Sequence, residues 1–241
     1  MNIQIHAENS VQLWLAPLAQ SYDESVLADY EALLDVDERA RWLRFYYPIH
    51  RQRFLVGRAF MRRVLADSLG HSDPASLQFI RMKHGKPELG GVHAGTLHFN
   101  LSHTDSMLVL AVSHRHAVGV DVEAVTRKVE LLALAQRYFT TQEYTAMLDM
   151  DPAAQRERFF TLWTLKEAWL KGRGLGLQIP LDDFSFSFEG KYPVVQFGPQ
   201  LADQPGDWQF RVMAQDEFRI ALAVNCGGDQ ALRVQILQWG V

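Results

Sequence analysis

The chain has 241 residues, 48% of them hydrophobic and 22% charged, as in ordinary globular proteins. Its net charge of −4 and pI near 6.1 argue against a general nucleic-acid-binding protein. No apolar run approaches the ~18 residues that cross a bilayer, and the first residues lack a signal-peptide pattern. The single cysteine, Cys226, excludes an internal disulfide and indicates a reducing compartment, so we expect a cytoplasmic protein without membrane partners.

The first part of the chain mixes strands and helices. An alternating apolar pattern predicts a strand, and three helices follow, the second with Asp37 as its expected N-cap and the third ending before Gly70. Three more strands are expected in one half-buried sheet. The predicted elements are strand 11–17, helices 25–34, 37–45 and 50–69, and strands 97–101, 107–112 and 118–125.

Arginines are concentrated between Arg39 and Arg63. This stretch has eight arginines and no acidic residue. Most arginine-rich stretches of this kind form the solvent-exposed face of a helix. Because no carboxylate inside the run balances the charge, we expect a polyanionic ligand, for which the arginine fork is suited.

The second part of the chain begins with helices, one of them capped by Thr140 or Thr141, and ends with strands. The predicted elements are helices 131–138, 141–148 and 156–171, and strands 184–188, 192–197, 208–212, 218–224 and 234–239. We therefore predict an α+β protein with two similar-sized halves, residues 1–115 and 116–241.

Two carboxylates lie on the strand predicted at 118–125. Because successive side chains alternate between the faces of a strand, Asp121 and Glu123 should point the same way. Gly119 precedes them on that face, where we expect it to leave room for a ligand. Hard oxygen ligands on a rigid strand suit Mg²⁺. The alternative is a pair of solvated acids on an edge strand.

The helix predicted at 156–171 carries further charges. At about 100° per residue, its side chains Trp163, Lys166, Glu167 and Lys171 fall within an arc of roughly 140°. The rest of the helix is largely apolar, so we expect it to be buried and its charges to have partners. An ion pair between Glu167 and Lys171 is the structural alternative, but it leaves Lys166 unexplained.

Four short motifs occur in order along the chain: Gly85-Lys86-Pro87, Asn100-Leu-Ser102-His103, Gly119-Val-Asp121-Val-Glu123 and Trp163-Thr-Leu-Lys166-Glu167-Ala-Trp-Leu-Lys171-Gly-Arg-Gly174-Leu-Gly176-Leu177. Together they resemble the motifs of the 4′-phosphopantetheinyl transferases, specifically the larger, surfactin-synthetase type. The resemblance implies a pseudo-dimer of two α+β halves with coenzyme A in the cleft between them. It also implies transfer of the phosphopantetheine arm to a serine of an apo acyl or peptidyl carrier protein, with release of 3′,5′-ADP.

The same resemblance assigns roles to individual residues. Magnesium ligands, with Mn²⁺ as a possible substitute, would be Asp121, Glu123 and Glu167. Groups taking part in catalysis would be Glu167 as the general base, with Lys171 and His103 offsetting charge. Contacts to coenzyme A would come from Arg53, Lys86, Pro87, Ser102, His103, Lys166 and Lys171. The carriers would be those of fatty-acid, polyketide or peptide synthesis, and the enzyme would be a monomer.

Two other functions are compatible with parts of this pattern. One is a non-catalytic module that binds coenzyme A or a nucleotide, although all three carboxylates are present. The other is a metal-dependent hydrolase that removes the arm from carriers. Binding of nucleic acid by the arginine stretch would show as salt-dependent binding to random oligonucleotides, and we expect none.

Overall fold

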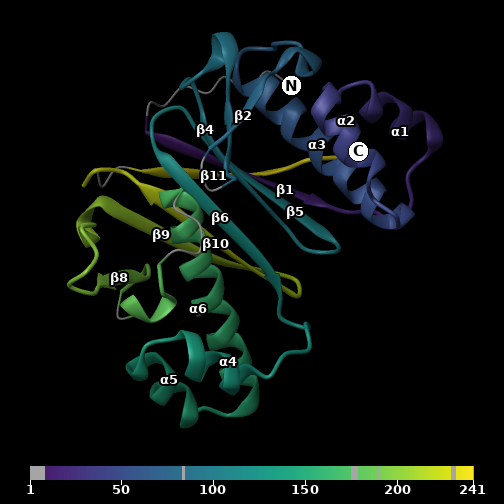
Figure 1. The fold of residues 1–241 in the computed structure, drawn as a ribbon. Coiled ribbons are helices and arrows are strands. Elements are labelled where there is room, and N and C mark those ends of the chain that lie inside the picture. The colour runs from purple at the N-terminus through teal and green to yellow at the C-terminus, as the bar shows by residue number, and fades with distance from the viewer. Residues whose placement is uncertain (1–8, 83–84, 175–178, 189, 229–231, 241) are drawn as a thin grey trace.

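The structure is a computed structural model that describes residues 9–82, 85–174, 179–188, 190–228 and 232–240. It mixes helices and strands throughout, which confirms the predicted α+β class (Figure 1). The helices are α1 (Glu24–Glu31), α2 (Val36–Leu43), α3 (Pro48–Ser68), α4 (Leu131–Tyr138), α5 (Thr141–Leu148) and α6 (Pro152–Arg173). The strands are β1 (Ser10–Pro17), β2 (Phe79–Arg81), β3 (Pro87–Leu89), β4 (His98–His103), β5 (Met107–Ser113), β6 (Ala117–Ala124), β7 (Phe184–Ser187), β8 (Val194–Phe197), β9 (Trp208–Gln215), β10 (Phe218–Asn225) and β11 (Arg233–Gln238).

Two sheets form the centre of the fold. One has the strand order β11-β1-β5-β4 and the other β6-β10-β9, while β2 pairs with β3 and β7 with β8. All neighbouring strands are antiparallel except β1 and β11, which run parallel. The C-terminal strand β11 therefore lies in the same sheet as the N-terminal strand β1, so the first sheet combines both ends of the chain, whereas the second is built from residues 117–225.

Three apolar clusters hold the elements in layers. Side chains of α3, such as Phe60, pack against β5 on the outer face of the first sheet. Valines of β6 pack between the two sheets with residues of β1 and β5, such as Leu13. The apolar side of α6, including Trp169, covers the outer face of the second sheet. The order of layers is thus helices, sheet, sheet and helix.

Capping residues set the helix boundaries. The N-cap of α2 is Asp35 and not Asp37, because Asp35 and Glu38 form a capping box. Thr140 caps α5 through the same kind of box with Glu143. The helix α6 begins earlier than predicted, since Asp151 accepts hydrogen bonds from two backbone amides at its start. None of the described helices is long and apolar enough to span a membrane.

The predicted place of β6 is wrong. We expected it to continue the sheet of β4 and β5, but it pairs with β10 in the second sheet. Its free edge is covered by side chains of β4: Asn100 Oδ1 accepts from the amide of Val120 at 2.9 Å, and Ser102 Oγ accepts from that of Val122 at 3.4 Å. The two sheets are therefore joined here by side chains and not by a backbone ladder.

Candidate active site

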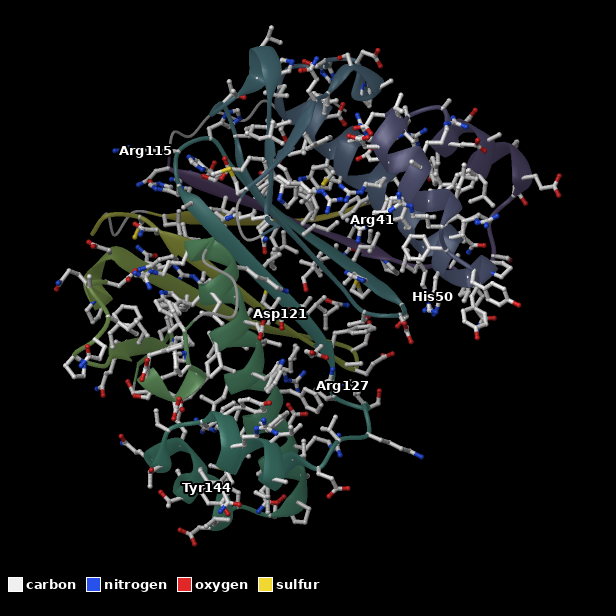
Figure 2. All side chains as sticks on the ribbon, viewed as in Figure 1. Arg41, His50, Arg115, Asp121, Arg127 and Tyr144 are labelled. Atoms are coloured by element: carbon white, nitrogen blue, oxygen red, sulfur yellow. The ribbon has the colours of Figure 1, made fainter. Side chains whose placement is uncertain are left out.

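Asp121 lies near the middle of the molecule, where β6 passes α6 (Figure 2). Its side chain is only 7% exposed, and the neighbouring valines of β6 are buried on the opposite face, as the strand alternation predicts. One oxygen, Oδ1, is bound by Lys171 Nζ at 2.6 Å and by Ser102 Oγ at 2.9 Å. Among the described residues, Oδ2 has no hydrogen-bond partner although it is buried. A buried carboxylate oxygen without a partner is costly and points to a ligand that the protein itself does not supply.

Lys171 connects three elements at this point. Its ammonium donates to Asp121 of β6 and, at 3.0 Å, to Ser102 Oγ of β4. The predicted alternative, an ion pair between Lys171 and Glu167, is not present: the carboxylate partner of Lys171 is Asp121. The lysine side chain is 30% exposed, so it keeps access to a ligand from solvent.

Glu123 and Glu167 complete the acidic side of the site. Burial raises the pKa of Glu167, the nearby carboxylate of Asp121 raises it further, and Lys171 opposes both effects. Burial also raises the pKa of Glu123, although Arg127, at 3.3 Å from its carboxylate, opposes this effect. Both carboxyl groups thus hold protons more tightly than isolated ones, mainly because they are partly buried.

Gly119 has a different role from the predicted one. A Cβ atom there would lie 2.0 Å from Ala168 O and 2.1 Å from Gly172 N, both in the backbone of α6. Gly119 therefore makes room for α6 and not for a ligand. This close approach brings Glu167 and Lys171 next to the carboxylates of β6.

Lys86 joins the β2–β3 hairpin to the end of α6. Its ammonium donates to the carbonyl oxygens of Lys171 at 3.0 Å, Val118 at 3.2 Å and Gly172 at 3.5 Å. Burial lowers the pKa of Lys86. The side chain that we expected at coenzyme A is therefore engaged by the protein, while Pro87 stands at the start of β3 beside it. Of the motifs, His84 and the segment 175–178 lie outside the described residues.

Arg53 and His103 lie at the open end of the same region. Arg53 Nη1 is 2.6 Å from Asp105 Oδ1, two residues beyond His103. Desolvation, together with the positive charge of Lys171, lowers the pKa of His103. The neutral form of His103 is therefore favoured over the charged form in the free protein, and the role of His103 in offsetting charge stays a prediction.

Lys166 does not share this site. Its side chain is 0% exposed and forms an ion pair with Glu143 of α5 at 2.9 Å. The prediction that it contacts coenzyme A does not fit this placement. Lys166 and Lys171 lie at the two limits of the predicted arc, roughly 140° apart around α6. They therefore contact different elements, Lys166 pairing with Glu143 and Lys171 with Asp121.

Carboxylates outside the arginine run balance part of its charge, contrary to our expectation. Arg62 is fully buried and binds Asp35 at 2.9 Å and Glu38 at 2.7 Å, and Arg58 lies 3.5 Å from Glu38. Asp35 and Glu38 come just before the arginine stretch in sequence, at the start of α2, and they contact Arg62 of α3. The charge of the stretch therefore does not by itself require a polyanionic ligand.

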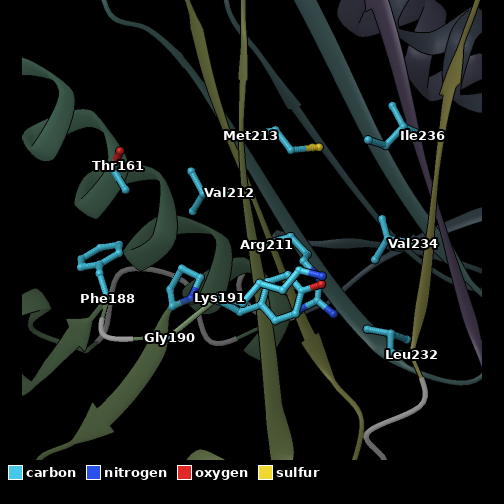
Figure 3. A pocket seen from close by; sticks show the side chains of 12 residues that line it. Thr161, Phe188, Gly190, Lys191, Arg211, Val212, Met213, Leu232, Val234 and Ile236 are labelled. Carbon is cyan, nitrogen blue, oxygen red and sulfur yellow. The ribbon is translucent and has the colours of Figure 1, made fainter.

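The groove between β9 and β11 is a separate feature (Figure 3). It has a volume of about 570 Å³ and contains none of the predicted site residues. Its walls are mainly apolar and include Met213, Val234 and Ile236. The chemistry of the protein is better sought at Asp121, where charges from three elements converge.

Comparison with known proteins gives the same answer as the motifs. Residues 117–223 match the 4′-phosphopantetheinyl transferase superfamily, and residues 22–115 match the N-terminal region of 4′-phosphopantetheinyl transferase. The chain is 39% identical over 170 residues to the 4′-phosphopantetheinyl transferase HetI of a Nostoc species, covering 70% of each protein. It belongs to the 4′-phosphopantetheinyl transferases. The resemblance predicted from the four motifs is thereby confirmed, and so is the prediction of an enzyme of this class.

The chain is also similar to other named proteins. It is 30% identical to the 4′-phosphopantetheinyl transferase Sfp of Bacillus subtilis, over 70% of this chain and 71% of that protein. Among solved structures, the holo-[acyl-carrier-protein] synthase of Thermotoga maritima is 27% identical and matches 45% of this chain and 61% of that one, with a TM-score of 0.37. The family assignment rests on the sequence relatives.

Proposed function

We propose that this protein transfers the 4′-phosphopantetheine arm of coenzyme A to a serine of an apo acyl or peptidyl carrier protein, releasing 3′,5′-ADP. The observation that carries the proposal is the meeting of Asp121 and Glu123 of β6 with Glu167 and Lys171 of α6. It is supported by relatives that are themselves named 4′-phosphopantetheinyl transferases.

The carboxylates fit a divalent metal ion, Mg²⁺ or Mn²⁺. Within the described residues, no three Asp, Glu, His or Cys side chains stand ready as a metal cluster, and Lys171 occupies one oxygen of Asp121. The unpartnered Oδ2 of Asp121 and the raised pKa values of Glu123 and Glu167 nevertheless favour a hard cation. We propose Asp121, Glu123 and Glu167 as its ligands. Such an ion would supply positive charge to the diphosphate of the substrate.

Glu167 is the proposed general base. It is half-buried beside Asp121, and its raised pKa makes it a stronger base than an ordinary carboxylate. It would take the proton of the carrier serine as the serine oxygen bonds to the β-phosphorus of coenzyme A. The bond from that phosphorus to the bridging oxygen breaks, and the oxygen leaves with 3′,5′-ADP.

The remaining residues would bind and orient coenzyme A. Lys171 is the proposed cation at the diphosphate, and Ser102 fixes its direction through the hydrogen bond between them. His103, whose pKa is lowered by burial and by Lys171, would hydrogen-bond to a phosphate oxygen, and Arg53 would bind the 3′-phosphate. Pro87 and the backbone of Lys86 would contact the adenine side. Lys166 is removed from the set because it is buried elsewhere.

We also propose that the fold is a pseudo-dimer whose halves meet near residue 116. In support, each of the two sheets has a long helix on its outer face, α3 in the first and α6 in the second. The pairing of β11 with β1 means that the first half borrows the last strand of the chain. A monomer that acts on carrier proteins in the cytoplasm remains our expectation.

The test is intact-protein mass spectrometry of an apo carrier protein incubated with this protein, coenzyme A and Mg²⁺. We expect the carrier to gain one phosphopantetheine arm, and we expect no gain with EDTA or when the carrier serine is replaced. A fatty-acid carrier and a peptidyl carrier should both be tried. Binding of coenzyme A without transfer to either carrier would contradict the proposal and favour a binding module.

A further inference from the structure

A second charged cluster lies on a different face of α6 from the proposed active site. At its centre Lys166 is fully buried. Its ammonium donates to Glu143 Oε2 at 2.9 Å, to Leu181 O at 2.8 Å and to Phe184 O. These three acceptors match the three donors of an ammonium group, so its hydrogen-bonding capacity is used within the protein.

Glu143 ties the same cluster to two other elements. Its Oε2 accepts from the backbone amide of Thr140 at 3.1 Å, which closes the capping box at the start of α5. Its Oε1 accepts from the amide of Phe186 in β7 at 3.0 Å. The side chain is 5% exposed. One ion pair thus fixes α6 against both α5 and β7.

This cluster is adjacent in sequence to the proposed base. Lys166 precedes Glu167 on α6, so any rotation of the helix that lets Lys166 leave Glu143 also turns Glu167 away from Asp121. We propose that the Lys166–Glu143 pair is a positioning device, which sets the rotation of the turn of α6 that carries Glu167, so that Glu167 faces the carboxylates of β6. Lys171, one turn further along, is held by its own bonds to Asp121 and Ser102. Lys166 itself does not touch the substrate. This inference rests on the proposed function.

The experiment compares two lysines of α6, Lys166 and Lys171, each with and without Glu143→Gln. Lys166→Met should lower kcat for carrier modification at least tenfold and change KM for coenzyme A by less than about threefold, because alignment and not binding is lost. Adding Glu143→Gln should recover at least about threefold of that kcat, since it removes the carboxylate left buried without its counter-charge. In Lys171→Met, the matched control, Glu143→Gln should give no recovery.

Two results would overturn the inference. One is a tenfold or greater rise in KM for coenzyme A in Lys166→Met, without recovery in the double variant, because Lys166 would then act on the substrate. The other is wild-type kcat in both Lys166→Met and Glu143→Gln. If Lys166→Met does not fold, as judged by near-ultraviolet circular dichroism, Glu143→Gln alone decides: a lowered kcat at unchanged KM supports positioning, and a wild-type kcat contradicts it.

Failure of the proposed function would be distinguishable from failure of this inference. If the wild-type protein modifies no carrier, that result contradicts the proposed function but does not test the positioning role of the Lys166–Glu143 pair. Binding of 3′,5′-ADP, measured by calorimetry, then tests the inference. A dissociation constant in Lys166→Met within about threefold of the wild-type value, together with at least tenfold weaker binding of Mn²⁺, supports it. Unchanged binding of both ligands, or tenfold weaker binding of 3′,5′-ADP, contradicts it.

Discussion

The two sides of α6 carry charge clusters of opposite character. On one side Lys166 and Glu143 are buried, and their hydrogen bonds are supplied by the protein. On the other, Asp121 keeps a buried oxygen without a partner among the described residues, and burial raises the pKa of the nearby Glu167. A charge cluster whose hydrogen bonds are all made within the protein stabilises the fold. A cluster that lacks positive charge and hydrogen-bond partners is a place where a ligand would supply both.

The largest effect is expected at the incomplete cluster. Asp121→Asn removes the negative charge that faces the proposed metal, so we expect carrier modification to fall about 1,000-fold or more, in line with the several kcal/mol that a metal ion supplies. The measurement is the rate of modification at saturating Mg²⁺. Asp203→Asn is a suitable control, because Asp203 is a partly buried aspartate paired with Arg173 at the end of α6. An equal loss of carrier modification in Asp121→Asn and Asp203→Asn would mean that Asp121 has no special role in the reaction.

Glu167→Gln should have the next largest effect. It keeps the size of the side chain but removes the proposed base, so kcat should fall about 100-fold or more while coenzyme A still binds. Turnover by mass spectrometry and binding by calorimetry measure the two quantities. Glu157→Gln changes a glutamate of the same helix that pairs with Arg219 outside the site, and it should stay near wild type. Near-normal turnover in Glu167→Gln would rule out its role as the base.

Gly119→Ala tests the contact that holds α6 against β6. Its Cβ would overlap the backbone of α6, so the free energy of unfolding should fall by about 3 kcal/mol or more, which is roughly 100-fold in the folding equilibrium. Denaturant titration measures this change. Gly57→Ala in α3 is the control, because its Cβ would meet only Leu108 at 3.8 Å. A Gly119→Ala variant as stable as the wild type would mean that α6 does not pack as described.

The smallest effect is expected at the edge of the site. Arg53→Ala should raise KM for coenzyme A about tenfold with little change in kcat, since it removes one charged hydrogen bond to the 3′-phosphate. The comparison substrate is dephospho-coenzyme A, for which the variant and the wild type should differ little. Arg39→Ala is the control from the same run, because Arg39 pairs with Glu31. An equal loss with both substrates would exclude this contact.

Local patterns predicted the part of the site that lies on single elements. Strand alternation placed Asp121 and Glu123 opposite the buried valines, and the capping pattern predicted the start of α5. The boundaries of α4 and the existence of each long helix were also predicted. These features depend on neighbours a few residues apart, which a sequence displays directly.

Contacts between distant segments were not predictable in this way. No local sequence pattern indicates that β11 pairs with β1, that Gly119 lies against α6, or that Glu143 forms an ion pair with Lys166. Helical spacing put Lys166 and Lys171 on a common arc, but only packing decides which neighbour each end of that arc meets. The sequence shows the motif that contains Asn100 and Ser102 on β4. Only the three-dimensional structure shows that these side chains bind the free edge of β6.

The most direct test of the central claim is a titration with Mn²⁺, followed by electron paramagnetic resonance in the presence of coenzyme A. If the incomplete cluster is the metal and catalytic centre, the wild-type protein should bind one Mn²⁺, Asp121→Asn should lose it, and Asp203→Asn, which changes the partner of Arg173, should keep it. Binding of Mn²⁺ by Asp121→Asn as tightly as by the wild type would contradict the account.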